Sequence, residues 1–189
     1  MENIVEIDDK CKDSQINIVA NSIKESKIVI MPTDTIYGFS CIKKSENKLR
    51  EIKKRESKPF IYLISNYNMF KEFDIDIDVY KNILEKNWPN MITFILLNKK
   101  NEKVAIRMPN DPILLKIIDI VNEPIISTSV NYSGEPIITN IDHIIDEFYN
   151  KVDLIVVNRS FLGSKESTIV DLTEDKYKII REGAVKFII

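Results

Sequence analysis

The chain has 189 residues, of which 44% are hydrophobic and 30% are charged, and its net charge is −2. This length suits one domain and the composition is typical of a globular protein, so we expect a single domain over residues 1–189. The near-neutral charge excludes a global electrostatic basis for nucleic-acid binding, although it leaves room for a local basic patch.

Targeting and metal-binding signals are absent from the sequence. The two cysteines, Cys11 and Cys41, belong to no CxxC or Cys/His cluster, which argues against structural zinc and suits a reducing cytosol. The first 15 residues are charged and lack the apolar core of a signal peptide. No apolar run approaches the ~18–20 residues of a membrane span. We therefore expect a cytoplasmic protein without membrane contact.

The first part of the chain predicts an alternation of helices and strands. Apolar residues recur at helical spacing over 16–23, and the β-branched run Ile28–Met31 predicts the next strand. Ser45 is a candidate N-cap for a charged helix that carries Ile52 on its apolar face. Phe60–Ile64 has the pattern of a buried strand. These elements already favour an α/β protein.

The second part of the chain continues this alternation. Tyr80, Ile83 and Leu84 mark a helix that ends near Trp88-Pro89. The pattern then predicts, in order, strands Ile92–Leu97 and Val104–Arg107 joined by a turn at 98–101, a helix over 112–121, a strand Ile125–Ser127, a helix Ile141–Tyr149, and strands Leu154–Val157, Ser167–Leu172 and Tyr177–Arg181. Together the elements predict a mixed α/β sheet with helices packed on it.

Polar segments follow the early strands, where ligand-binding groups usually lie. Pro32–Gly38 places two threonines, an aspartate and a tyrosine directly after a strand. Its hydroxyls suit a small polar substrate, or it is a turn capped by its own Thr or Asp side chains. Lys53–Pro59 carries four cations in six residues, which suit phosphates. The alternative for this segment is a solvated helix end whose cations complement the helix dipole.

Three later segments have the same character. Arg107 ends an apolar strand and needs a partner there, either a ligand or an internal salt bridge. Ser127–Pro136 gathers hydroxyls and an amide, which suit phosphate or ribose or else stabilise a turn. Ser164–Asp171 again places hydroxyls before a strand, and Ile180–Gly183 ends a later strand with an arginine. Each segment taken alone leaves both interpretations open.

The sequence lacks the usual catalytic signatures. It contains no GxxxxGK[ST] phosphate loop and no GxGxxG motif. The sole histidine, His143, lies in a helix of ordinary pattern, so no histidine-based triad is expected. Cys41 has the pattern of a buried, inert thiol, and Trp88 that of a core residue. Hydroxyls and cations without a nucleophile favour electrostatic catalysis, in which substrates react with each other on a preorganised surface.

Seven motifs in order resemble the YrdC-like, threonylcarbamoyl-AMP synthase family. They read PTDTIYGF, KRESKP, WPNMIT, VAIRMP, SVNYSGEP, ESTIVD and REGA, and they span residues 31–184. The resemblance implies an open, twisted mixed sheet with flanking helices and a concave, locally positive cleft. It implies a nucleotidyltransferase that condenses L-threonine, bicarbonate and ATP to threonylcarbamoyl-AMP and pyrophosphate for the t6A modification of tRNA. The chain resembles the short, single-domain form of the family.

The resemblance also implies roles for individual residues. Those implied to bind threonine are Thr35, Tyr37, Arg107 and Ser167. Those implied to bind the nucleotide are Lys53, Arg55, Lys58, Thr93, Ser129, Asn131 and Arg181. Arg55 and Lys58 are also the expected catalytic groups, because charge builds on phosphate oxygens during the reaction. Mg²⁺ is expected to arrive on ATP, so no protein metal ligand is assigned.

Three departures from the family pattern lie beside the nucleotide. Asn90-Met91 replaces Gly-Pro, Val130 replaces alanine, and Glu56 stands where proline is common. None removes an expected ligand. The expected partners beyond the substrates are the transferase complex that uses the intermediate and a weak contact with tRNA.

Two other functions fit parts of the sequence. A non-catalytic RNA-binding module of the same fold would use the basic face, although it would not need Thr35, Arg107 and Ser167. A carbamoyl-transfer domain of hydrogenase-maturation proteins is less compatible, because those domains lie in much larger chains with zinc-finger-like cysteines.

Overall fold

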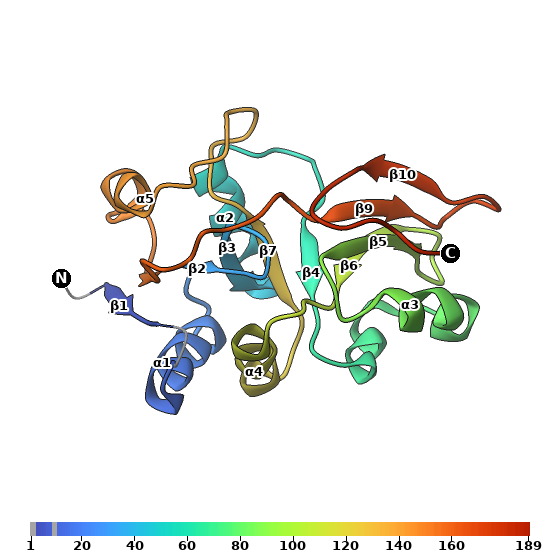
Figure 1. Cartoon of the computed structure of the whole chain (residues 1–189), viewed down its shortest axis with the longest axis horizontal. Helices are drawn as coiled ribbons and strands as arrows, with labels where there is room; N and C mark the ends of the chain where they lie inside the picture. Colours follow the sequence, from blue (N-terminus) through green and yellow to red (C-terminus); the bar gives the residue numbers. More distant parts are fainter. Residues whose placement is uncertain (1–2, 9–10) are drawn as a thin grey trace.

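A ten-stranded mixed sheet with helices on both faces forms the molecule (Figure 1). The computed structural model describes residues 3–8 and 11–189. The strands are β1 (Ile4–Glu6), β2 (Val29–Pro32), β3 (Tyr37–Ile42), β4 (Ile61–Leu63), β5 (Ile92–Leu97), β6 (Lys103–Arg107), β7 (Ile125–Ser129), β8 (Leu154–Val157), β9 (Thr168–Asp171) and β10 (Lys178–Arg181). The helices are α1 (Asp13–Lys24), α2 (Glu46–Lys53), α3 (Lys81–Asn87), α4 (Pro112–Val121) and α5 (Ile141–Phe148), with 3₁₀ turns at Lys43–Ser45, Tyr67–Phe73 and Ile77–Val79.

The strand order places distant motifs side by side. It runs β1-β8-β2-β3-β7-β4-β6-β5-β9-β10. The pairs β1/β8, β8/β2, β4/β6 and β5/β9 are parallel, and the other neighbours are antiparallel. Five of the strands lie side by side, in the order β2, β3, β7, β4 and β6. The polar segments at their ends therefore meet near the middle of the sheet.

Two apolar layers stabilise the sheet, one on each face. In β2, Val29 and Met31 contribute to one layer, whereas Ile30 and the preceding residue Ile28 contribute to the other, as expected for side chains that alternate across a strand. Helices α1, α3 and α4 cover the first face and α2 and α5 cover the second (Figure 1). Most strands are therefore buried on both sides, which explains their continuous apolar runs.

The predicted α/β sheet is confirmed, and two strands are additions to the prediction. β3 was not among the strands predicted above, because the first four residues of YGFSCI overlap or adjoin the polar segment that ends at Gly38. It is nevertheless buried throughout, between β2 and β7. β1 has only three residues and pairs with β8. Both strands are recruited by neighbours that are distant in sequence, which local pattern does not reveal.

Ser45 corrects one local prediction. It occupies the position before α2, but its hydroxyl does not cap the helix. The hydroxyl instead donates to the carbonyl oxygen of Ser26 at 2.6 Å. The residue therefore ties α2 to the turn after α1, a long-range contact in place of a local cap.

Three residues set aside on sequence grounds behave as predicted. His143 is exposed on α5. Cys41 is fully buried, and burial raises the pKa of its thiol to about 12, so the thiol stays protonated. Trp88 is buried among aromatic rings and donates its indole N–H to the carbonyl oxygen of Ile92 at 2.6 Å.

Over the part of the chain that the structure describes, no helix has the length and apolarity to cross a bilayer.

Candidate functional site

Strand ends from distant parts of the chain line one small cavity of about 40 Å³. The lining residues are Thr33, Thr35, Ile36, Gly38, Ile61, Arg107, Ser127, Thr128, Ser129, Glu166, Ser167 and Arg181. Five of the residues predicted from the motifs are among them, namely Thr35, Arg107, Ser129, Ser167 and Arg181. The structure therefore brings five of the predicted site residues to one place.

A buried ion pair forms one wall of this cavity. Arg107 places Nη2 3.0 Å from Oδ1 of Asp34, and the two side chains are only 5% and 2% exposed. Burial lowers the pKa of Arg107 while Asp34 opposes that change; burial raises the pKa of Asp34 while Arg107 opposes it. The internal salt bridge considered from sequence is therefore present. Within the described part of the chain, however, Nε of Arg107 has no hydrogen-bond partner.

The turn after β2 is held by its own hydroxyls. Thr33 donates from Oγ1 to the carbonyl oxygen of Ile36 at 2.7 Å and accepts from the backbone N–H of Thr35 at 3.2 Å. Oγ1 of Thr35 lies 3.0 Å from that of Thr33 and 3.4 Å from Nη1 of Arg107. At Gly38 a Cβ atom would lie only 3.0 Å from Oγ of Ser127, so a residue with a side chain would crowd that hydroxyl. The turn thus aims Thr35 at the arginine.

The opposite wall is built around Ser167. Its Oγ lies 2.9 Å from Oγ1 of Thr93, and its carbonyl oxygen accepts from Nε of Arg181 at 3.0 Å. Arg181 also donates to Oγ of Ser167 and to the carboxylate of Glu166. At Gly183 a Cβ atom would lie 2.1 Å from the carbonyl oxygen of Glu166, so this position accepts only glycine. Thr93, expected to contact the nucleotide, lies outside the cavity lining and supports Ser167.

Lys53 differs from its expected role. It is buried, and its ammonium donates to the carbonyl oxygens of Ser129 and Asn131 at 2.6 and 2.8 Å and to Oδ1 of Asn131 at 2.9 Å. All three of its donors are therefore occupied by protein. Burial lowers its pKa to about 7. Lys53 holds the segment that carries Ser129 instead of presenting a free cation to a phosphate.

Asn131 is likewise occupied by protein contacts. Its Oδ1 accepts from Oγ of Ser129 at 2.7 Å as well as from Lys53, and its Nδ2 donates to the carbonyl oxygen of Glu135 at 2.7 Å. It is not among the residues that line the cavity. The second N–H of Nδ2 is the donor that the expected nucleotide contact of Asn131 could use without loss of these bonds.

Arg55 and Lys58 lie at the edge of the cavity. Nε of Arg55 donates to the carbonyl oxygen of Lys58 at 3.0 Å, and its Nη1 lies 3.4 Å from Oγ1 of Thr128, a lining residue. Arg50 donates to the same carbonyl at 3.2 Å, and both guanidinium groups lie over Phe60, at 4.6 and 4.7 Å. This grip fixes the backbone of Lys58, whose side chain is exposed. Arg50 precedes the motif, so sequence gave no signal for it.

Tyr37 contacts a loop beside the cavity. Its hydroxyl accepts from the backbone N–H of Asn158 at 2.9 Å and donates to the carbonyl oxygen of Asn158 at 3.1 Å. Its ring meets Phe161 edge-on at 5.2 Å, and it is not among the cavity-lining residues. Tyr37 therefore anchors the segment 158–164, whose Ser164 N–H donates to the carbonyl oxygen of Thr35 at 2.6 Å.

A second hollow of about 310 Å³ adjoins the cavity. The two share Ile36, Glu166 and Arg181, so the Glu166–Arg181 ion pair stands between them. Sequence reasoning gave no role to Asp34 or Glu166. The sequence did hold a signal for them. Asp34 and Glu166 each lie inside one of the motifs, and two arginines that end predicted strands, Arg107 and Arg181, needed partners.

Comparison with known proteins gives a consistent picture. A family model named Sua5/YciO/YrdC and described as telomere recombination matches residues 21–183. The chain is 29% identical to threonylcarbamoyl-AMP synthase of Pyrococcus abyssi in an alignment of 199 positions, gaps included, that covers 98% of this chain and 58% of that protein. It is 32% identical to threonylcarbamoyl-AMP synthase of Wigglesworthia glossinidia brevipalpis over 181 residues, with coverage of 87% and 92%.

Solved structures agree on the fold. The crystal structure of P. abyssi Sua5 complexed with L-threonine superposes with a TM-score of 0.85 at 29% identity, covering 95% of this chain and 57% of that one. The crystal structure of Escherichia coli YciO gives a TM-score of 0.84 at 24% identity and covers both chains fully. The chain thus spans somewhat more than half of the P. abyssi protein and the whole length of YciO.

Proposed function

Because this chain belongs to the Sua5/YciO/YrdC family, we propose that it joins L-threonine, bicarbonate and ATP into threonylcarbamoyl-AMP. The names of its relatives and the threonine complex of one of them support this proposal. Pyrophosphate and water are the other products. The protein would then be a nucleotidyltransferase that supplies the t6A transferase complex, and a weak contact with tRNA belongs to the same proposal.

The reaction needs electrostatic stabilisation more than it needs a base. The amine of threonine first takes up carbon dioxide from bicarbonate to form a carbamate. A carbamate oxygen then attacks the α-phosphorus of ATP, and the bond to pyrophosphate breaks. Negative charge gathers on the phosphate oxygens, which cations and oriented N–H groups stabilise. The site offers arginines, hydroxyls and backbone groups of this kind.

The observation that carries the proposal is the state of Arg107. A buried guanidinium with an unpaired Nε, beside Thr35 and Ser167 in one cavity, is suited to a small carboxylate. We assign the carboxylate of threonine to Arg107, with Thr35 and Ser167 on the rest of the amino acid.

The nucleotide would extend from the adjoining hollow past Arg181 to the edge of the smaller cavity, where Ser129 and Arg55 lie. Because the carbamate oxygen must bond to the α-phosphorus, the two substrates have to meet at the wall between the hollows, where Arg181 lies. Arg181 and Ser129 would contact the α-phosphate region, and Arg55 and Lys58 the departing pyrophosphate. In this arrangement Lys53 and Asn131 act by positioning Ser129.

Mg²⁺ is proposed to arrive on ATP, held by phosphate oxygens and water. Among the described residues, no group of three His, Cys, Asp or Glu side chains is placed to hold a metal. The proposed metal therefore depends on the nucleotide for its ligands, and its charge would neutralise the pyrophosphate as that group leaves.

The test is release of pyrophosphate from ATP by the purified protein. We expect release to require both threonine and bicarbonate, and Arg55→Ala to lose most of it while remaining folded. Arg159→Ala is the matched control, because Arg159 is an exposed arginine that pairs with the surface carboxylates of Glu6 and Asp142. Full release without threonine would overturn the proposal. Wild-type turnover by Arg55→Ala would overturn the assignment of Arg55.

A further inference from the structure

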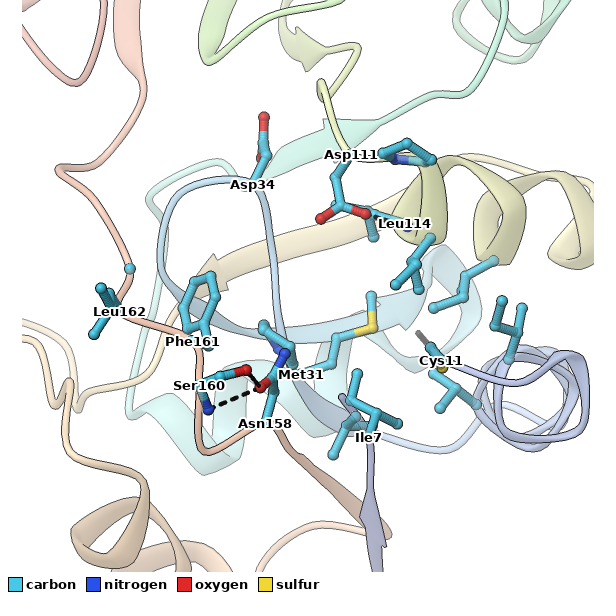
Figure 2. Close-up of a pocket in the computed structure, with 18 of the residues that line it drawn as sticks. Ile7, Cys11, Met31, Asp34, Asp111, Leu114, Asn158, Ser160, Phe161 and Leu162 are labelled. Carbon is cyan, nitrogen blue, oxygen red and sulfur yellow. Dashed lines mark hydrogen bonds between the residues drawn. The ribbon is translucent and has the colours of Figure 1, made fainter. Parts of the chain in front are cut away.

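A larger cavity of about 660 Å³ lies apart from the site just described. It is enclosed by α1, α4, the end of β2 and the segment 158–164 (Figure 2). Its walls are mainly apolar, and Ile16, Val19, Met31, Ile117, Val156 and Phe161 are among them. Hollows of this size with apolar walls and a few polar groups are typical of small-molecule sites.

The charged residues in the described lining of this cavity are acidic. Its described lining includes Asp34 and Asp111 and no lysine, arginine or histidine. The carboxylate of Asp34 is turned away from the other lining side chains and pairs with Arg107 (Figure 2). The carboxylate of Asp111 is turned toward them (Figure 2). Among the residues that the structure describes, Asp111 is therefore the charged group that faces an occupant.

Asp111 has one oxygen free for a ligand. Its Oδ1 accepts from the backbone N–H of Leu114 at 2.8 Å and caps α4. Within the described part of the chain, Oδ2 has no hydrogen-bond partner. The carboxylate of Asp111 therefore borders a space whose other walls are mainly apolar.

We propose that this cavity binds a small molecule with an apolar body and one ammonium group that pairs with Asp111. The body gains from leaving water in proportion to its apolar surface. The ammonium gains a charge-assisted hydrogen bond, which is stronger than a neutral one. An anion of the same shape would meet the unpaired charge of Asp111 and gain nothing in return.

This site borders the other without sharing its ligands. The backbone of Pro32 and Asp34 lines the cavity, and the next residue of the same turn, Thr35, lines the smaller one. The ammonium-bearing molecule would therefore contact one side of the turn at 32–35, and the first site lies on the other side of that turn. The inference does not depend on the reaction proposed above.

Three probes of one shape test the charge preference. We would measure binding of 4-phenylbutylammonium, 4-phenylbutan-1-ol and 4-phenylbutanoate to the full chain by calorimetry. The ammonium should bind about tenfold more tightly than the alcohol, because one charge-assisted contact replaces a neutral one. The anion should bind most weakly.

Matched variants locate the site. Asp111→Asn keeps a capping side chain but removes the charge, so it should abolish the preference for the ammonium and leave binding of the alcohol unchanged. Asp119→Asn is the control, because Asp119 lies on the same helix but contacts Asn66 outside the cavity. Ile113→Trp fills space at the lining and should weaken all three probes.

Several results would overturn the proposal. Equal binding of ammonium and alcohol by the unaltered protein would remove the role of charge. An ammonium preference that survives Asp111→Asn, or binding that is insensitive to Ile113→Trp, would place the probe elsewhere. Absence of binding by all three at about 10 mM would show that the cavity takes no such ligand, since ligands of this size gain enough to bind well below that concentration.

Discussion

The pair Asp34–Arg107 provides the sharpest prediction, because it has both a structural and a ligand-binding interpretation. Arg107→Met removes the cation and leaves the Asp34 carboxylate buried, with backbone N–H donors such as that of Asn110 at 3.2 Å but no countercharge from Arg107. Breaking one side of such a buried pair destabilises a protein by about 3–5 kcal/mol. This is a large share of the roughly 5–15 kcal/mol that stabilises an ordinary domain.

The double variant separates the two interpretations. Asp34→Asn combined with Arg107→Met removes both charges, so most of the lost stability should return, to within about 1–2 kcal/mol of the unaltered protein. Threonine-dependent pyrophosphate release should stay lost, because the carboxylate of threonine would have no cation. A purely structural arginine predicts instead that activity returns together with stability.

The measurements are urea unfolding followed by Trp88 fluorescence and pyrophosphate release at varied threonine. The single tryptophan is buried, so its emission reports unfolding directly. A loss below about 1 kcal/mol for Arg107→Met would contradict the buried pair. A wild-type KM for threonine in the double variant would contradict the ligand assignment.

Three further predictions concern other parts of the structure. Burial lowers the pKa of Lys53 from 10.5 to about 7. Between about pH 7 and 10.5 the unfolded chain therefore binds more protons at this residue than the folded chain, so the free energy of unfolding should rise with pH. Lys53→Met should flatten this rise, which denaturation at several pH values would measure. Gly183→Ala should destabilise by at least about 3 kcal/mol because its Cβ overlaps backbone atoms, whereas Gly134→Ala should lose only about 1–2 kcal/mol from its positive φ; thermal melts would compare them. Cys41, buried with a raised pKa, should resist a thiol reagent in the native protein while the partly exposed Cys11 reacts, so titration should count one thiol before unfolding and two after.

The fold was predictable where local pattern reflects burial. The run that became β5 and the helical spacing in α4 were predicted with bounds close to those observed, because both elements bury apolar residues at the period of their backbone. β3 escaped prediction because its small and polar residues are buried by neighbours from elsewhere in the chain. The apolar periodicity of a sequence predicts elements that bury their own apolar residues. It does not predict burial that depends on residues distant in the sequence.

The candidate site divides in the same way. The sequence by itself determined which residue types follow the strands, and its resemblance to the family predicted a shared site for Thr35, Arg107 and Ser167, which line one cavity in the structure. Only the tertiary structure decided which acceptors those donors meet. It placed the ammonium of Lys53 on Ser129 and Asn131 and the hydroxyl of Tyr37 on a loop. A sequence gives each side chain its donors and charge, but partners 70 or more residues away are chosen by strand order and packing, which no local pattern encodes.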